Sequence, residues 1–377
     1  MFSFARHSKS KISNWWWTVD KVNFSLVLFL IFIGTMLVLS ASPSAAHRDR
    51  IADEFIFIKK QMIFICAGLF LLIGISMQSL RTIRRLAILG FFCAFVGVIL
   101  TYVVGDATKG AARWIKFAGF SLQPSEFIKP TFIVVTAWLL DASKKIEDFP
   151  GKTLSLGLYV VTASAILGQP DLGMTIVVTS VWCMQIFLAG IPLWLVGSML
   201  LFGIVLISGS YFFLAHVRYR IDHFLASEVE IGSQTQQSLK AFESGNLLGQ
   251  GPGDGFVKLT LPDVHTDFIF SLAGEEYGVW LPSIIAIIFA IIVVRSMRLS
   301  VKDNNLFVMY AASGLAASVG LQAIVNMCST LKIIPAKGMT LPFISYGGSS
   351  MLACSLAMGM LLAITRKNAV AEDKDIK

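Results

Sequence analysis

The chain has 377 residues, of which 55% are hydrophobic and 14% charged, with a formal net charge of +8. Soluble domains carry about 25% charged residues, so a chain with a mean hydropathy of +0.73 has too few charges to cover a soluble globule. The basic residues are spread over short loops and both tails, which excludes a nucleic-acid-binding face and indicates membrane topology instead.

Apolar runs of about 20 residues recur along the chain, and a run of that length crosses a bilayer as a helix. They predict an all-α polytopic membrane protein with about ten transmembrane helices, in which residues 1–377 form one transmembrane domain. The predicted spans are Asn23–Ser40, Phe55–Met77, Leu86–Val104, Phe127–Leu140, Leu154–Leu167, Met174–Leu188, Leu193–Ala215, Tyr277–Val294, Leu306–Cys328 and Met351–Ile364.

The predicted topology places both termini on the same side of the membrane, because the number of spans is even. Basic residues cluster in the loops on that side, which the positive-inside rule makes cytoplasmic. Residues 1–21 and 366–377 are then cytoplasmic tails, and one long loop, residues 216–276, lies outside between helices seven and eight. The basic residues concerned are Arg81, Arg84, Arg85, Lys144, Lys145, Lys152, Arg295, Arg298, Lys302, Arg366 and Lys367.

Two acids and a histidine stand within five positions in the long loop, in the run Leu261–Phe270: Asp263, His265 and Asp267. Charges at a membrane boundary are costly and therefore indicate function, although a solvated loop with ordinary charges is the alternative. His265 is more typical of local hydrogen bonding than of catalysis. The neighbouring run Gly249–Gly255 is not followed by the Gly-Lys-Ser/Thr of a phosphate-binding loop, and we interpret it as a flexible turn.

Cations are predicted in other outside loops. Lys109–Lys116 contributes Arg113 and Lys116, and Glu126 and Lys129 lie three residues apart at the start of a helix, where they share a face. A structural i,i+3 ion pair is the alternative for that couple.

A third outside segment, residues 335–350, adds Lys337 and is too rich in Pro and Gly to be a plain helix. Together, the outside cations suit an anionic lipid headgroup such as a pyrophosphate, with a carboxylate nearby as general base.

Five motifs closely resemble those of the SEDS family (shape, elongation, division and sporulation), and they occur in the family's order. They are Arg113–Ile115, Gln123–Lys129, Gln169–Gly173, Leu261–Phe270 and Pro342–Ser350. The tryptophan-rich entry to the first span and the glycine-rich run resemble the FtsW-type division branch more than the RodA-type elongation branch. One departure is Asp263, which stands where the family usually has a glutamate.

The resemblance implies a peptidoglycan glycosyltransferase that polymerises lipid II on the outer face of the bacterial cytoplasmic (inner) membrane, at the division septum. Asp267 matches the family's essential aspartate, the proposed general base. We assign pyrophosphate and substrate binding to Arg113, Lys129, Glu126, Lys337 and Ser349, and supporting roles to Asp263, His265 and Asp171.

The resemblance is also compatible with a divalent cation, Mg²⁺ or Mn²⁺, at the pyrophosphate, with ligands that stay unknown, and it implies no organic cofactor. The expected partners are lipid II, a class B penicillin-binding transpeptidase and other membrane proteins of the division machinery, and no nucleic acid. Three alternatives stay open: a lipid II flippase, which needs a polar path across the bilayer, a RodA-like elongation polymerase, and a non-enzymatic scaffold.

Overall fold

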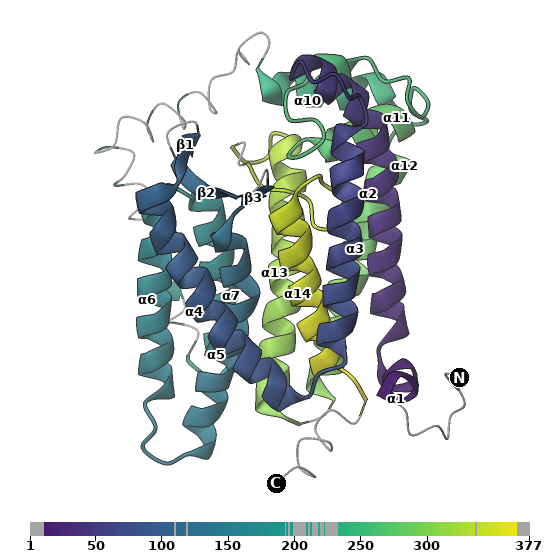
Figure 1. Cartoon of the computed structure of the whole chain (residues 1–377). Helices are drawn as coiled ribbons and strands as arrows, with labels where there is room; N and C mark the ends of the chain where they lie inside the picture. Colours follow the sequence, from purple (N-terminus) through teal and green to yellow (C-terminus); the bar gives the residue numbers. More distant parts are fainter. Residues whose placement is uncertain are drawn as a thin grey trace.

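The computed structural model describes residues 11–108, 111–117, 120–192, 233–302, 304–335 and 338–367, and seven single residues between 194 and 222. Over these residues the protein is a bundle of long helices (Figure 1). Helix α1 (Lys11–Thr18) lies at one end, and a small sheet with helices α10 (Gln234–Gly245) and α11 (Ile269–Tyr277) lies at the other. The predicted all-α membrane architecture is confirmed at this level. The predicted seventh span falls mostly outside the described residues, so the count of ten stays a prediction.

Among the described helices, six are long and apolar enough to cross a membrane: α2, α3, α4, α6, α12 and α13. Helices α7 and α14 are apolar but shorter. Every predicted span that falls on described residues has a helix at its position. The bounds are α2 Lys21–Arg48, α3 Ile56–Ser76, α4 Leu80–Val104, α5 Pro124–Lys145, α6 Gly151–Gly168, α7 Leu172–Leu188, α12 Trp280–Val301, α13 Leu306–Thr330 and α14 Gly348–Ile364.

Helix α5 is the central element, and the sequence-based prediction of Phe127–Leu140 was too short for it. The helix has 22 residues and packs against α4, α13, α6, α14 and α7, so protein surrounds it. Buried Glu126 and Lys129 belong to its first two turns, and Asp141 to its last. These charges interrupt the apolar run in the sequence, but they face neighbouring helices instead of lipid, which makes them tolerable.

A three-stranded antiparallel sheet joins α4 to α5, and the sequence analysis did not anticipate it. The strands β1 (Asp106–Thr108), β2 (Ala111–Phe117) and β3 (Phe120–Leu122) lie in the order β1-β2-β3. Ile115 pairs with Leu122 across β2 and β3. This sheet caps the bundle end above α4 and α5 (Figure 1) and holds Arg113 on β2.

The glycine-rich run is held against α11 by its backbone and is not a free turn. The amides of Gln250 and Gly251 donate to the carbonyls of Glu275 (2.9 Å) and Glu276 (3.1 Å). Gly251 has a φ of 112°, a left-handed conformation that side chains disfavour. Helix α10, a 3₁₀ turn (η1, Val257–Leu259) and α11 therefore give the described part of the predicted long loop a defined structure.

A buried ion pair fastens the region formed by α10, η1 and α11 to α2. Lys258 Nζ lies 2.8 Å from Glu276 Oε1, with only 7% and 0% of their side chains exposed. The Ser40 hydroxyl of α2 donates to the same carboxylate and accepts from Lys258 Nζ at 3.1 Å. Arg48, the last residue of α2, donates to the Leu261 carbonyl. The segment that leads to Asp267 is thus anchored on a membrane helix.

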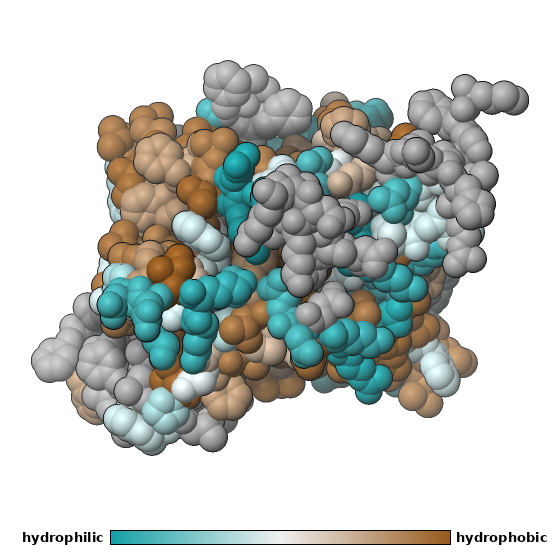
Figure 2. Space-filling view, turned by 90° about the horizontal axis from the view of Figure 1, so that it is seen from below, coloured by the Kyte–Doolittle hydropathy of each residue, from teal (hydrophilic) through white to brown (hydrophobic). Residues whose placement is uncertain are grey.

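Figure 2 shows the α1 end of the bundle, where hydrophilic side chains gather among hydrophobic ones. The basic residues used for the topology prediction stand at the helix ends that meet here. Arg81 and Arg84 lie in the first turns of α4, and Lys144 and Lys145 in the last turn of α5. Arg295 of α12 holds Asp20, the N-cap of α2, through three hydrogen bonds of 2.8–3.0 Å. One end of the bundle is therefore basic.

Breaking the Lys258–Glu276 pair is expected to destabilise the fold strongly. Glu276→Ala leaves the buried ammonium without its carboxylate, which costs about 3–5 kcal/mol. Asp53→Ala, which breaks a pair with side chains 40% and 64% exposed, is the control and should leave the unfolding temperature nearly unchanged. Thermal unfolding of the purified protein in detergent measures both changes, and equal unfolding temperatures for the two variants would contradict the assigned role.

Candidate active site

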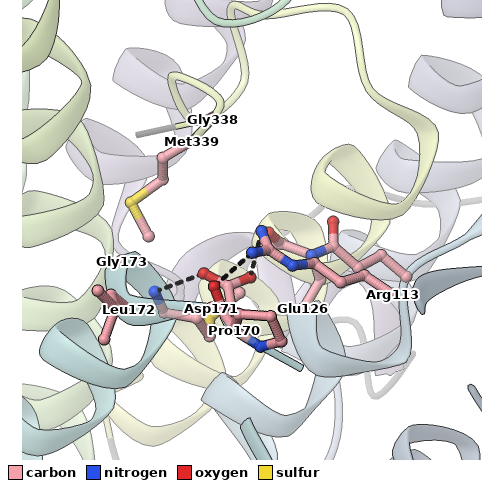
Figure 3. A pocket seen from close by; sticks show the side chains of 10 residues that line it. Arg113, Glu126, Pro170, Asp171, Leu172, Gly173, Gly338 and Met339 are labelled. Atoms are coloured by element: carbon pink, nitrogen blue, oxygen red, sulfur yellow. Dashed lines mark hydrogen bonds and ion pairs between the residues drawn. The ribbon is translucent and has the colours of Figure 1, made fainter. Parts of the chain in front are cut away.

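A cavity opens at the sheet end of the bundle, between β2, the start of α5, the α6–α7 turn and the segment before α14 (Figure 3). Its volume is about 110 Å³. Pockets that enclose a drug-sized ligand measure roughly 300–1,000 Å³, so this cavity holds only part of a large substrate. Its lining combines two acids and an arginine with backbone and apolar groups: Arg113, Gln123, Glu126, Pro170, Asp171, Leu172, Gly173, Met174, Gly338 and Met339.

Arg113 reaches from β2 across the cavity wall to the α6–α7 turn (Figure 3). Its guanidinium donates to the carbonyls of Gln169 (2.9 Å) and Pro170 (2.5 Å) and lies 3.3 Å from a carboxylate oxygen of Asp171. Asp171 also caps α7, because its other oxygen accepts the Met174 amide at 3.1 Å. The two predicted residues Arg113 and Asp171 are therefore brought together, and the guanidinium fixes the turn that forms one wall.

Lys129 and Glu126 form the i,i+3 ion pair that the sequence analysis gave as the alternative to substrate binding, with 2.7 Å between Nζ and Oε2 and side chains only 4% and 7% exposed. Lys129 also donates to the side-chain carbonyl of Gln322 on α13, at 2.5 Å. The Lys129 charge is thus neutralised and bonded inside the bundle. Glu126 both holds this lysine and lines the cavity, while substrate binding by the two residues stays a prediction.

Asp267 stands at the edge of the same cavity, just before α11. A Cβ placed on the cavity-lining residue Gly338 would lie 3.1 Å from Asp267 Oδ2. Around Asp267, the Leu261–Phe270 run bonds to the segment before α14. The Ser345 hydroxyl donates to the Thr266 carbonyl at 2.6 Å, and the Tyr346 amide to the His265 carbonyl at 2.8 Å. Two motifs whose bonded residues Thr266 and Ser345 are 79 positions apart therefore form one unit beside the cavity.

A family model of cell cycle proteins, covering FtsW, RodA and SpoVE, matches residues 21–370. The protein belongs to the FtsW/RodA/SpoVE family. A relative in Caulobacter vibrioides, named "Probable peptidoglycan glycosyltransferase FtsW", is 40% identical over 97% of this chain and 94% of its own. A relative of the same name in Trichlorobacter lovleyi is 36% identical over 95% and 96%. The resemblance drawn from the five motifs is thereby confirmed.

Two solved structures share the fold of this family member. One chain comes from work on a peptidoglycan synthase complex that coordinates polymerization and crosslinking; its TM-score is 0.77, and the match covers 92% of this chain and 97% of that one. The other is the rod shape determining protein RodA of Thermus thermophilus, with a TM-score of 0.69 and coverage of 93% and 97%. Both are 24% identical, so they establish the fold alone.

In this FtsW/RodA/SpoVE protein, His265 is a packing residue. Its ring lies 4.3 Å from the Phe57 ring and 5.4 Å from the Tyr346 ring, measured between centroids, and its Nδ1 is buried without a partner. Burial lowers the pKa of His265 to about 4, against an ordinary 6.5, and Asp263 opposes this shift. The imidazole is therefore neutral at pH 7, and its supporting role stays a prediction.

Asp263 and Ser349 hold local structure at the edges of the site. Asp263 adopts a left-handed φ of 55°, and its carbonyl accepts the Thr266 and Phe268 amides at 3.1 and 3.2 Å. The Ser349 hydroxyl accepts the Gln123 amide at 2.9 Å, so it ties the start of α14 to the start of α5. Neither residue lines the cavity. Their assignment to substrate or support stays a prediction.

Lys337 lies outside the described residues, although its neighbour Gly338 lines the cavity. The sequence analysis missed Gln322 and Asn326, two buried carboxamides on α13 that bond to the site's backbone. The available signal was two amide side chains four residues apart in an otherwise apolar span. Within the described residues, no group of three His, Cys, Asp or Glu side chains could hold a metal ion.

The buried imidazole makes the stability of the protein depend on pH. Because the folded-state pKa of His265 is about 4, the unfolded chain binds more protons between pH 6.5 and 4, and stability falls as pH drops through that window. The loss approaches about 3 kcal/mol at the low end. His265→Gln should unfold with a weaker pH dependence than wild type. Parallel thermal unfolding of both proteins from pH 7 to pH 4.5 measures this, and identical slopes would contradict it.

Proposed function

We propose that this protein is a peptidoglycan glycosyltransferase that polymerises lipid II during septal cell-wall synthesis. The supporting observation is that two relatives, each named a probable peptidoglycan glycosyltransferase FtsW, align with nearly the whole chain at 40% and 36% identity. The identity to RodA of Thermus thermophilus is lower, at 24%, which favours the division branch over the elongation branch. A polar cavity at the end of the bundle opposite the basic face is where an enzyme of this kind would bind a lipid-linked headgroup.

In the proposed reaction, the Asp267 carboxylate takes the proton from the 4-hydroxyl of the acceptor sugar. The hydroxyl oxygen forms a bond to the anomeric carbon of the growing chain while the bond from that carbon to the phosphate oxygen breaks. The electron pair leaves with undecaprenyl pyrophosphate, and the configuration inverts in this single step. A positioned base contributes about 10²–10⁴ in rate, and orientation and charge stabilisation supply the rest.

The cavity arginine is the proposed contact for the pyrophosphate. Arg113 already donates to two carbonyls and pairs with Asp171, but a guanidinium has five N–H donors, so two remain for a phosphate. Lys129 is bonded to Glu126 and Gln322. It would therefore act on the pyrophosphate through its charge at a distance, or directly after giving up one of these two partners. Lys337 remains the third proposed cation of the site.

The proposed divalent cation would accompany the pyrophosphate. Mg²⁺ is commonly held by one or two carboxylates together with substrate phosphate oxygens and water. The cavity carboxylates Glu126 and Asp171 are each paired with a basic side chain, so the cation would take most of its ligands from the substrate. Its chemistry would be to stabilise charge on the leaving group.

The location and partners follow from the same proposal. The basic end of the bundle would face the cytoplasm of a bacterial inner membrane, with both termini there, and the cavity would face outward. The similarity to a chain from a peptidoglycan synthase complex supports a class B penicillin-binding transpeptidase as partner. The rival proposal, a flippase, needs a polar path across the bilayer. Buried polar groups such as Gln185 and Thr136 instead bond to each other and to backbone at 2.7–3.1 Å, which supports a packing role.

Replacement of the proposed base should abolish polymerisation. We expect Asp267→Asn to form no glycan strands, because an amide cannot accept the hydroxyl proton, while Asp53→Asn, at an exposed carboxylate, polymerises normally. The assay follows fluorescent lipid II on gels, with the cognate transpeptidase and a divalent cation present. Equal polymer from Asp267→Asn and wild type would remove the base assignment. Lipid II translocation in vesicles without any polymer would favour the flippase.

Loss of the cavity guanidinium should weaken substrate binding. Arg113→Gln is expected to raise the KM for lipid II about tenfold or more, since a charge-assisted contact to phosphate contributes roughly 1.5–3 kcal/mol. Arg295→Gln breaks an equivalent Arg–Asp pair at the opposite end of the bundle and is the control. Steady-state polymerisation kinetics of both variants decide the point, and an unchanged KM for Arg113→Gln would contradict the pyrophosphate assignment.

A further inference from the structure

Helix α13 carries two carboxamides one turn apart, Gln322 and Asn326, with 2% and 0% of their surfaces exposed. A buried amide is costly unless its hydrogen-bonding groups find partners. Since α13 is otherwise apolar enough to be a membrane span, both side chains need protein partners. Those partners belong to the two irregular segments beside the cavity and to α5.

Asn326 uses both of its amide hydrogens on backbone carbonyls. Nδ2 donates to the carbonyl of Asp267 at 2.8 Å and to the carbonyl of Met339 at 2.7 Å. Both partners accept only, so the orientation of the amide is determined by the contacts. One side chain thus connects the residue proposed as the base with a residue that lines the cavity.

Gln322 makes the matching connection one turn earlier. Its Nε2 donates to the Thr340 carbonyl at 3.0 Å, and its Oε1 accepts from Lys129 at 2.5 Å. Consecutive residues, Met339 and Thr340, are therefore held by consecutive turns of α13. A continuous set of contacts runs from the Glu126–Lys129 pair through α13 to the backbone of Asp267.

We propose that Asn326 is a positioning residue for Asp267: it fixes the backbone of Asp267 relative to Met339, and so holds the carboxylate at the cavity edge next to Gly338. This inference rests on the proposed function, in which Asp267 is the general base. Asn326 reaches the reaction only through the backbone of Asp267. Its loss therefore acts on the rate of the chemical step more than on binding, and a displacement of about 1 Å can cost about 10² in rate.

A matched control exists at the other end of the bundle. Asn23 is also 0% exposed, donates to another helix through Ser296 at 2.9 Å, and has a side-chain oxygen without a partner, as Asn326 has. Asn23→Ala and Asn326→Ala therefore remove the same chemical group from equally buried sites. A difference in activity that their unfolding temperatures do not explain is therefore due to the place of Asn326 beside Asp267.

The kinetic test compares wild type, Asn326→Ala, Asn326→Asp and Asn23→Ala in lipid II polymerisation with the cognate transpeptidase. Asn326→Asp keeps the side-chain volume but, as a protonated carboxyl in this buried site, can donate at most one of the two hydrogen bonds. We expect both Asn326 variants to lower kcat about tenfold to a hundredfold with KM within about twofold. We expect Asn23→Ala to keep kcat although it also lowers the unfolding temperature. A full kcat in folded Asn326→Ala would overturn the proposal.

A second measurement does not depend on activity. Asp267→Cys and Gly338→Cys together should form a disulfide, since a Cβ on Gly338 lies 4.0 Å from Asp267 Cγ. Mass spectrometry of the linked peptides gives its rate of formation. We expect the rate to fall when Asn326→Ala is added and to stay the same when Asn23→Ala is added. An unchanged rate with Asn326→Ala would overturn the positioning role. A reduced rate in a protein whose wild type makes no polymer would keep that role and reject the proposed function.

Discussion

The ion pair between Lys129 and Glu126 in α5 is the interaction on which the arrangement of the site depends. A charge in the interior of a membrane protein is tolerated only when the protein itself neutralises and hydrogen-bonds it. Glu126 supplies the opposite charge, and Gln322 of α13 supplies a further acceptor. Helix α5 must therefore be enclosed by other helices, with α13 beside it, and this explains why the most polar of the long helices is the central one.

The same requirement explains how irregular backbone can exist beside the bundle. The segment before α14 and the run around Asp267 have few backbone partners of their own. Carbonyls of these two segments accept hydrogen bonds from the side chains of Gln322, Asn326 and Ser345. The Tyr346 amide also donates to the His265 carbonyl. Polar groups that cannot reach water must be paired within the protein. Satisfying them here also brings Asp267 to the cavity.

The cavity contains its charges in pairs. Arg113 is matched by Asp171, and Glu126 by Lys129, so the three charged residues of the described cavity lining are all paired. An anionic lipid headgroup would then add to, or exchange with, a carboxylate that is already in place. Such prepositioned groups need little reorganisation during a reaction, which is the condition under which electrostatic stabilisation is most effective.

The sequence by itself determined the membrane class, the positions of the long helices and the shared helix face of Glu126 and Lys129. These are local properties: the length of an apolar run, or two side chains three residues apart on one helix. The five motifs also sufficed for the family. The sequence did not predict the sheet, the full length of α5, or the roles of Gln322 and Asn326.

Only the tertiary structure decided which polar groups meet. Lys129 and Gln322 are 193 residues apart, Gln123 and Ser349 are 226 apart, and Asn326 is 59 from Asp267. No periodicity or spacing in the sequence encodes such a contact, because it depends on how whole helices pack. The chain therefore specifies its candidate base locally, whereas the position of that base relative to the cavity is set by α13.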